Sequence, residues 1–182
     1  MLGRGPFLWV LVGLTVNVFG CVTSAPDTRG SQFANPAELR GDPKTIEEIR
    51  SAFTRFEQAL QQRDLEGVME LYAERYRDRQ FMKDDLKEEW QQALATYHSF
   101  SATHLITRVE AHSDNAQPTA FVTCSGSISA VSNATGTRVM LDSWIGEVHW
   151  MVEEKGAWRI LVNASDERNP VDVRIASHQH HQ

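Results

Sequence analysis

The sequence predicts one α+β domain in which the helices come first and an antiparallel sheet follows. Two observations support this. Apolar residues recur at helical spacing between residues 45 and 99, and from 102 to 164 they recur at every second position. Helices that precede a run of strands are typical of folds in which the helices cover one face of the sheet. We therefore expect three N-terminal helices packed on a four-stranded antiparallel sheet.

Length and composition limit the possible classes of function. The 182 residues suit one domain with extensions. The net charge is -6 and the 18 basic residues are dispersed, so no nucleic-acid partner is expected. Two cysteines exclude a disulfide scaffold. Zinc-ligand spacings, phosphate-binding glycine loops and Ser-His-Asp orders are missing from the sequence, which predicts neither a metal nor a cofactor.

Residues 1–20 have the form of a secretory signal, because Arg4 precedes a short apolar stretch over 7–16. The following Val18-Phe19-Gly20-Cys21 resembles the lipobox of bacterial lipoproteins, although Phe19 departs from the small or polar residue usual there. The resemblance implies lipidation of Cys21, cleavage before it, and membrane attachment in the bacterial cell envelope. Val22 in place of aspartate implies the periplasmic face of the outer membrane. The alternative is an ordinary secretory signal cleaved after Ala25.

Residues 21–44 are rich in Pro, Ser, Gly, Asp and Asn, and we interpret them as the lipidated cysteine and a flexible tether. The first helix is predicted to begin at Thr45, because Thr45 and Glu48 have capping-box spacing. Its buried face carries Ile46, Ile49, Phe53, Phe56 and Leu60, whereas Arg50, Arg55 and Glu57 are expected off that face.

Asp64 is expected to cap the second helix, whose apolar face carries Leu65, Val68, Met69, Tyr72 and Tyr76. A third helix is predicted from about Asp84 to Ser99, with Leu86, Trp90, Ala93, Leu94 and Tyr97 buried. Four strands are predicted over 102–112, 119–131, 138–153 and 157–164, followed by a polar tail over 165–182. In the first strand, Leu105 is expected to face inward and His104 outward.

This order of elements resembles the nuclear transport factor 2-like, or SnoaL-like, cone fold over residues 45–164. The segment that carries most of the resemblance is Gly156-Ala157-Trp158-Arg159-Ile160 after a charged turn. The resemblance implies that the sheet is curved and the domain cone-shaped. The superfamily contains isomerases, dehydratases and hydrolases as well as non-catalytic binding modules, so the fold alone does not choose a function.

The hairpin before residue 157 is predicted to have a three-residue loop over 154–156, which places Glu153 opposite Ala157. Alternation then gives an apolar inner face that includes Asp142, Trp144, Trp150 and Trp158. The other face carries Glu147, His149 and Arg159, which we interpret as a polar cluster at a homodimer interface or as a catalytic or metal-binding set. A shift of one residue would exchange the two faces.

Asp142 is the candidate catalytic residue, because a carboxylate on an apolar inner face can move protons. Alternatively, it lies solvated at the open end of the sheet or bonds Arg138. The candidate ligand-binding residues are aromatic, and core packing is the alternative interpretation of each: Tyr72, Tyr76, Tyr97, Trp144, Trp150 and Trp158. Cys124 is expected to be a buried structural thiol, and His178, His180 and His181 a solvated cluster or a weak metal site.

The sequence supports two functions. The first is a lipid-anchored, non-catalytic module that binds a small apolar ligand or a partner protein and forms a homodimer through the outer sheet face. The alternative is a small-molecule isomerase, dehydratase or hydrolase that uses Asp142 as its general acid/base.

Overall fold

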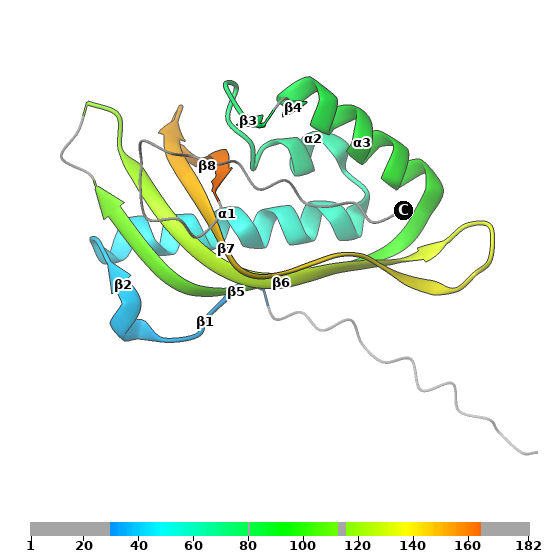
Figure 1. The fold of residues 1–182 in the computed structure, drawn as a ribbon, viewed down its shortest axis with the longest axis horizontal. Helices are drawn as coiled ribbons and strands as arrows, with labels where there is room; N and C mark the ends of the chain where they lie inside the picture. Colours follow the sequence, from blue (N-terminus) through cyan, green and yellow to red (C-terminus); the bar gives the residue numbers. More distant parts are fainter. Residues whose placement is uncertain (1–29, 80, 113–115, 165–182) are drawn as a thin grey trace, which may run out of the picture.

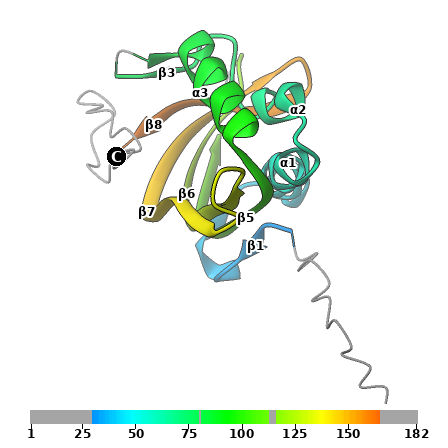
Figure 2. The ribbon, with the colours of Figure 1, turned by 90° about the vertical axis from the view of Figure 1, so that its right-hand side faces the viewer.

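The computed structural model describes residues 30–79, 81–112 and 116–164. Within them, the helices form one layer and a curved sheet forms the other (Figures 1 and 2). This is the α+β architecture that the sequence predicts. The order along the chain is β1 (Gln32–Phe33), a 3-10 turn (Pro36–Glu38), β2 (Leu39–Arg40), α1 (Pro43–Gln62), α2 (Leu65–Met69), β3 (Arg77–Asp78), β4 (Phe81–Met82), α3 (Lys83–Thr96), β5 (Tyr97–His112), β6 (Thr119–Ser132), β7 (Arg138–Glu154) and β8 (Ala157–Ala164).

The N-cap of helix α1 lies three residues before Thr45, the N-cap predicted from the capping box. Asp42 is its N-cap, and the Asp42 carboxylate accepts hydrogen bonds from the backbone N–H groups of Lys44 and Thr45. Pro43 occupies the first turn, where its missing N–H has no cost. Asp42 and Pro43 together therefore determine where the helix begins, and Thr45 lies within its first turn.

Helix α2 is shorter than its apolar pattern predicts. It ends at Met69, and Tyr72 instead forms an isolated parallel bridge with Ile160 of β8. Tyr76 follows in a turn, where its N–H donates to the carbonyl of Ala73. Both tyrosines are nevertheless buried, because the turn holds them against the sheet.

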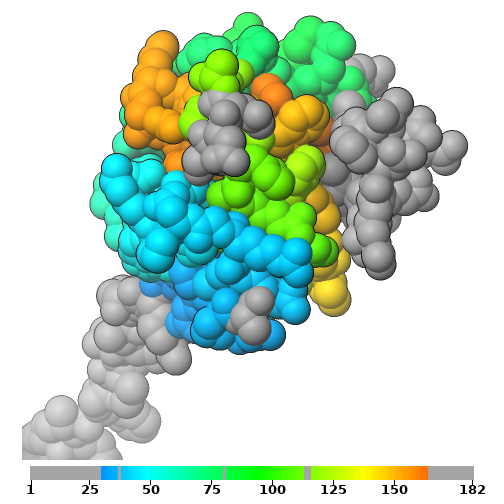
Figure 3. Space-filling model, turned by 90° about the vertical axis from the view of Figure 1, so that its left-hand side faces the viewer, coloured from blue at the N-terminus to red at the C-terminus, as the bar shows by residue number. Residues whose placement is uncertain are grey.

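The six-stranded sheet has the order β1-β5-β6-β7-β8, with β2 also paired to β5. The four long strands are antiparallel as predicted, whereas β1 and β2 pair with β5 in parallel. Residues 30–42 therefore lie along the edge of the sheet, in contrast to the tether predicted up to residue 44. We call residues 30–42 the N-terminal arm; Figure 3 shows it in blue beside α1.

Irregularities in strand pairing change which residues face the helices. Along β5, Ala102, His104 and Ile106 are buried, but after a shift between Ile106 and Arg108 it is Val109 that is buried. A bulge inserts one residue and so reverses the alternation beyond it. The prediction that Leu105 faces inward and His104 outward is therefore wrong: Leu105 is 43% exposed.

Strand β7 contains a similar shift at its pairing with β6. Trp144 lies opposite Gly126, but the next regular pair is Glu147 with Cys124. Gly146, with φ +67°, provides the backbone conformation that an ordinary residue seldom adopts. Because of this shift, Trp144 and His149 lie on the same inner face although they are five positions apart.

The β7–β8 hairpin differs from the prediction by one residue. Glu154 pairs with Ala157, so the loop contains only Lys155 and Gly156, both at positive φ. Two residues at positive φ are typical of a tight hairpin turn whose twist matches that of the strands. The shorter loop exchanges the faces near the turn, so Met151 and His149 are buried inside while Trp150 lies on the outer face.

The core lies between α1 and the inner face of the sheet. Its largest fully buried side chains include Phe53, Ile49, Leu60, Ile106 and Met151. Across the ranges that the structure describes, none of the helices is long and apolar enough to cross a membrane.

Candidate functional site

A chain of hydrogen bonds runs through the interior between β6, β7 and β8. Trp144 Nε1 donates to Cys124 Sγ at 3.2 Å, and Cys124 Sγ lies 3.1 Å from His149 Nε2. His149 Nδ1 lies 2.8 Å from Asn163 Oδ1, and Asn163 Nδ2 donates to Tyr76 Oη at 3.2 Å. Cys124, His149, Asn163 and Tyr76 are all buried. We call this set of five residues the closed network.

The direction of each hydrogen bond follows from the chemistry of the groups. Asn163 uses its Nδ2 as donor, both to Tyr76 and to Asp78 Oδ2 at 3.5 Å, so its Oδ1 is the acceptor. His149 Nδ1 therefore carries a proton and donates to it. In a neutral imidazole, Nε2 is then an acceptor, and the Cys124 thiol donates to it.

Burial keeps the Cys124 thiol protonated, which suits its role as a donor. Desolvation raises the pKa of Cys124 to about 12. Burial also raises the pKa of Tyr72 and of Tyr76 above the ordinary tyrosine value, and the negative charges of Asp78 and Glu147 act in the same direction. His149 has both ring nitrogens bonded to protein groups, so this histidine is not available as a general base.

A second set of hydrogen-bonded polar side chains connects the N-terminal arm, α1 and β5. Ser31 Oγ donates to Glu57 Oε1 at 3.0 Å, and His104 Nδ1 lies 3.0 Å from the same oxygen. The side chains of Glu57 and His104 are only 4% and 5% exposed. Because a carboxylate oxygen that accepts from Ser31 also faces Nδ1, Nδ1 is the protonated nitrogen of His104. We call Ser31, Glu57 and His104 the open network.

The open network differs from the closed network at one atom. His104 Nε2 makes no hydrogen bond to any residue that the structure describes. The His104 ring is held by aromatic neighbours, with Phe53 at 4.9 Å and Trp144 at 5.2 Å between ring centroids. Its orientation is therefore fixed, while one nitrogen remains available.

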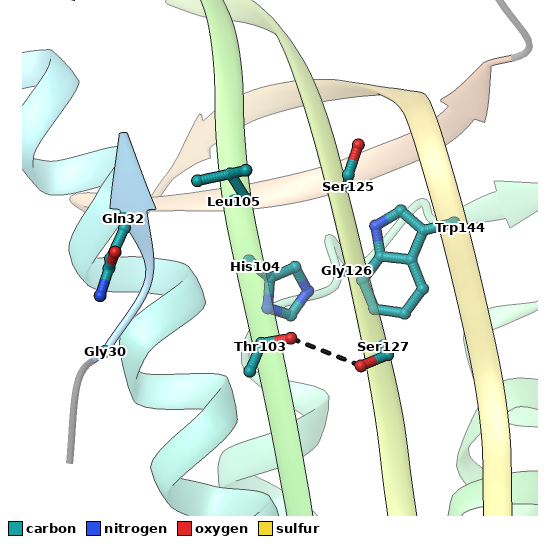
Figure 4. Close-up of a pocket in the computed structure, with 9 residues that line it drawn as sticks. All are labelled: Gly30, Gln32, Thr103, His104, Leu105, Ser125, Gly126, Ser127 and Trp144. Carbon is teal, nitrogen blue, oxygen red and sulfur yellow. Dashed lines mark hydrogen bonds between the residues drawn. The ribbon is translucent and has the colours of Figure 1, made fainter. Parts of the chain in front are cut away.

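Gly126 permits this arrangement. The His104 ring from β5 and the Trp144 ring from β7 approach each other at Gly126 of β6 (Figure 4). A Cβ atom at Gly126 would lie 2.2 Å from the Thr103 carbonyl oxygen and 2.5 Å from Trp144 Cζ2. Glycine within a strand often marks such a close approach.

A groove of about 520 Å³ opens beside the open network. Thr103 and Leu105 belong to the face of β5 opposite its buried residues, so the groove lies on the outer side of the sheet. We call it the outer groove. Hydroxyl groups, one amide and two apolar side chains are mixed in its lining, which consists of Gly30, Gln32, Thr103, His104, Leu105, Ser125, Gly126, Ser127 and Trp144.

The structure separates the site residues expected from the sequence. Asp142 is half-buried on β7 opposite Ile128 and does not line the outer groove. Its role as general acid/base stays a prediction. Tyr72 and Tyr76 pack edge to face, with ring centroids 5.0 Å apart, and Tyr97 is half-buried at the start of β5.

The candidate tryptophans do not share one surface. Trp144 is inside, where it contacts Cys124 and His104. Trp158 is buried in the core. Trp150 stacks on Phe121 on the outer face, which corrects its expected inner position; the cause is the two-residue hairpin.

The prediction that Glu147, His149 and Arg159 form one polar cluster on the outer face is also wrong. His149 is buried in the closed network, whereas Arg159 donates to the backbone carbonyl of Glu70. Within residues 30–79, 81–112 and 116–164, there is no group of three His, Cys, Asp or Glu residues that could hold a metal ion. Cys21, the signal segment, and the histidines of the tail lie outside the described residues.

Sequence reasoning missed Ser31, Glu57, His104 and Asn163. Glu57 is buried, although we expected it off the apolar face of the first helix. A usable signal was present: Glu57 lies four positions after Phe53 and three before Leu60, so it borders the apolar face. Gly126, an isolated glycine within an alternating strand, was another signal.

No known protein family pattern matches the sequence, and no curated protein is similar to it in sequence. The fold has clear counterparts among solved structures. A conserved protein from Planctomyces limnophilus is similar with a TM-score of 0.58 and 13% identity, over 68% of this chain and 96% of that one. A candidate scytalone dehydratase from Novosphingobium aromaticivorans gives 0.50 and 12%, over 76% and 95%. A protein of unknown function from Mycobacterium tuberculosis gives 0.50 and 18%, over 73% and 78%.

At these identities the likeness shows the fold alone. The domain has the nuclear transport factor 2-like, or SnoaL-like, fold that the sequence resemblance predicted. Its structural neighbours include both a dehydratase-like protein and proteins without a known function. The fold therefore does not distinguish binding from catalysis, and that distinction has to be argued from the residues of the site.

Proposed function

We propose that the folded domain is a non-catalytic binding module, carried in the cell envelope on a lipid attached to Cys21, and that its ligand site is the outer groove. The observation that carries this proposal is the closed network. Both ring nitrogens of His149 are bonded to protein groups and the Cys124 thiol is protonated, so these two interior groups hold the core together and are not placed to move protons.

The outer groove has the properties of a small-molecule site. Ligand pockets commonly have volumes of about 300–1,000 Å³ and combine apolar walls with a few fixed polar groups. The outer groove has about 520 Å³. Leu105 and Trp144 supply apolar surface, and Thr103, Ser125 and Ser127 supply hydroxyl groups. A small, largely apolar ligand fits this chemistry.

The position of the N-terminal arm supports a short connection to a membrane. Only residues 22–29 separate Cys21 from Gly30, the first residue of the arm. Eight residues span at most about 30 Å when fully extended. A lipid on Cys21 would therefore keep β1 and the outer groove close to the bilayer surface.

Two experiments test the two halves of this proposal. Metabolic labelling with palmitate should label the wild-type protein and not Cys21→Ser, and cleavage after Ala25 with no label would contradict the anchor. For the groove, amide NMR spectra of the protein mixed with neutral aromatic fragments should show shifts at residues 103–105 and 125–127. Shifts confined to the closed network, or none at millimolar fragment, would contradict the groove as the ligand site.

Self-association through the outer sheet face remains a proposal as well. This face carries Ile145, which is 95% exposed, in addition to Leu105. Exposed apolar side chains on a sheet face favour association when they form a contiguous patch. Sedimentation at micromolar concentration should show a dimer that Ile145→Lys dissociates; a monomer in both proteins would refute the idea.

A further inference from the structure

We infer that the start of the N-terminal arm, residues 30–34, is a gate on the outer groove. The groove holds its ligand only while these residues are docked, and Ser31 is the residue that docks them. This inference rests on the proposed function of the groove as the ligand site. It adds a conformational control of that site, in which ligand binding and docking of the arm stabilise each other.

The first step is the direction of alternate side chains in β1. Gln32 pairs with Leu105, whose side chain is exposed on the outer face of the sheet. Phe33 pairs with the fully buried Ile106 and packs against the core. Gly30 and Gln32 line the outer groove, and Figure 4 shows Gln32 beside Leu105. The arm therefore supplies one wall of the groove.

The second step is the residue between the two lining positions. Ser31 is only 2% exposed, and its Oγ donates to Glu57 Oε1 of α1 at 3.0 Å. Glu57 is itself buried. Hydrogen bonds to a carboxylate are among the stronger side-chain hydrogen bonds in proteins. Neither Ser31 nor Glu57 belongs to the lining of the groove, so this bond holds the wall from behind.

The third step is the small number of other contacts that hold the arm. Strands β1 and β2 each pair with β5 over only two residues. Among the arm residues whose burial the structure describes, Ser31 is the only buried one, and Phe33 and Leu39 are half-buried. The other walls belong to β5, β6 and β7, which pair along most of their lengths. Segments with few buried contacts open at a lower free energy than the core, so the arm is the wall that opens first.

The arm and the ligand are therefore coupled. A ligand that contacts Gly30 or Gln32 binds the docked arm more tightly than the undocked arm, and each event then favours the other by the same factor. The Ala34 amide reports docking, because its N–H donates to the carbonyl oxygen of Ile106 at 2.8 Å. This amide exchanges its hydrogen with solvent when that bond opens.

The first test needs no change to the arm. It uses the full chain carrying Cys21→Ser and indole as a neutral aromatic probe, with hydrogen exchange followed by NMR. Indole at about ten times its dissociation constant should slow exchange at Ala34 about tenfold, because the arm opens only after indole leaves. Without indole, Ala34 should exchange faster than Val122, which pairs with both β5 and β7. Equal rates at the two amides would overturn the gate, since the arm would then open only with the whole domain.

Variants give the reverse test. Ser31→Ala removes the bond to Glu57 without changing the lining, and it should speed exchange at Ala34 about fivefold. Adding Phe33→Ala removes the apolar contact of the arm with the core. This double variant should bind indole about fivefold or more weakly, because only molecules with a docked arm bind it. The matched control is Ser101→Ala, at an exposed position of β5 outside the groove, which should change neither quantity.

The outcomes separate this inference from the proposed function. Indole shifts at 103–105 and 125–127 without slower exchange at Ala34, or with unchanged affinity in the folded double variant, would overturn the gate and leave the groove as a ligand site. No shift at these residues at millimolar indole would overturn the groove as well. Slower exchange at Ala34 with indole, while Ala34 alone exchanges faster than Val122, supports both, and it decides the matter if the double variant does not fold.

Discussion

The two buried histidines of this domain are placed in opposite states by their neighbours. His149 is bonded at both ring nitrogens, to Cys124 and to Asn163, and is part of the core. His104 is bonded at one nitrogen, to Glu57, and its other nitrogen has no partner in the described part of the chain. Burial is therefore common to both histidines, and the number of ring nitrogens bonded to protein groups is what separates them.

The largest expected effect comes from removing His104 alone. His104→Leu leaves the buried Glu57 carboxylate with Ser31 as its remaining partner in this network. Unpairing a buried charge costs about 3–5 kcal/mol, which should appear as a lower free energy of unfolding in urea. The additional change Glu57→Leu should recover most of the loss. A double variant as unstable as His104→Leu would contradict the open network as described.

Gly126→Ala tests the contact that brings the two networks together. The added Cβ would collide with the Thr103 carbonyl and the Trp144 ring, and overpacking of this kind costs about 1–3 kcal/mol. Gly136→Ala is the control, because a Cβ there meets no atom within 4 Å and adds only the strain of a positive φ. Thermal unfolding should show the larger loss for Gly126→Ala. The reverse order would contradict the packing at Gly126.

Asn163→Leu opens the closed network at its centre. The change removes the acceptor for His149 Nδ1 and the donor to Tyr76 Oη, and each unsatisfied buried group costs about 1–3 kcal/mol. Urea unfolding should show a loss of about 2 kcal/mol, while binding of neutral aromatic fragments in the outer groove of the remaining folded protein should not change. If fragment binding falls with stability unchanged, Asn163 belongs to the ligand site instead.

The smallest effect is a pH dependence that originates in Cys124. Burial raises the pKa of this thiol from 9.0 to about 12, so the unfolded chain loses the proton first as pH rises. The thiol therefore contributes its full stabilisation below pH 9, and this contribution falls by up to about 1.4 kcal/mol per pH unit between pH 9 and 12. Cys124→Ala should flatten this decrease between pH 9 and 10, measured by urea unfolding. An equal slope in both proteins would contradict a buried, protonated thiol.

The sequence was sufficient to predict the layers of the fold. The change of apolar period after residue 100 separates the helices from the strands, and the four long strands fall within a few residues of their predicted ranges. The likeness to the nuclear transport factor 2-like fold is confirmed by solved structures of similar shape.

The site could not be predicted because it depends on strand irregularities. A period of two assigns faces correctly only while pairing is regular, and the shifts near Thr107 and Gly146 each reverse the alternation. They place His104 and His149 inside, where the pattern placed them outside. Ser31, which donates a hydrogen bond to Glu57, could not be predicted either. Its segment has the composition of a tether, and nothing in that composition indicates pairing with β5.

The difference between the two histidines can be measured directly by long-range proton–nitrogen NMR correlation spectra of the wild-type protein and of Cys124→Ala. We predict a proton at Nδ1 of each ring, and we expect Cys124→Ala to shift the Nε2 resonance of His149 and not that of His104, because the Cys124 thiol bonds His149 Nε2. A shifted His104 with an unchanged His149, or no shift in either ring, would contradict the central claim that His149 is bonded at both ring nitrogens and His104 at one.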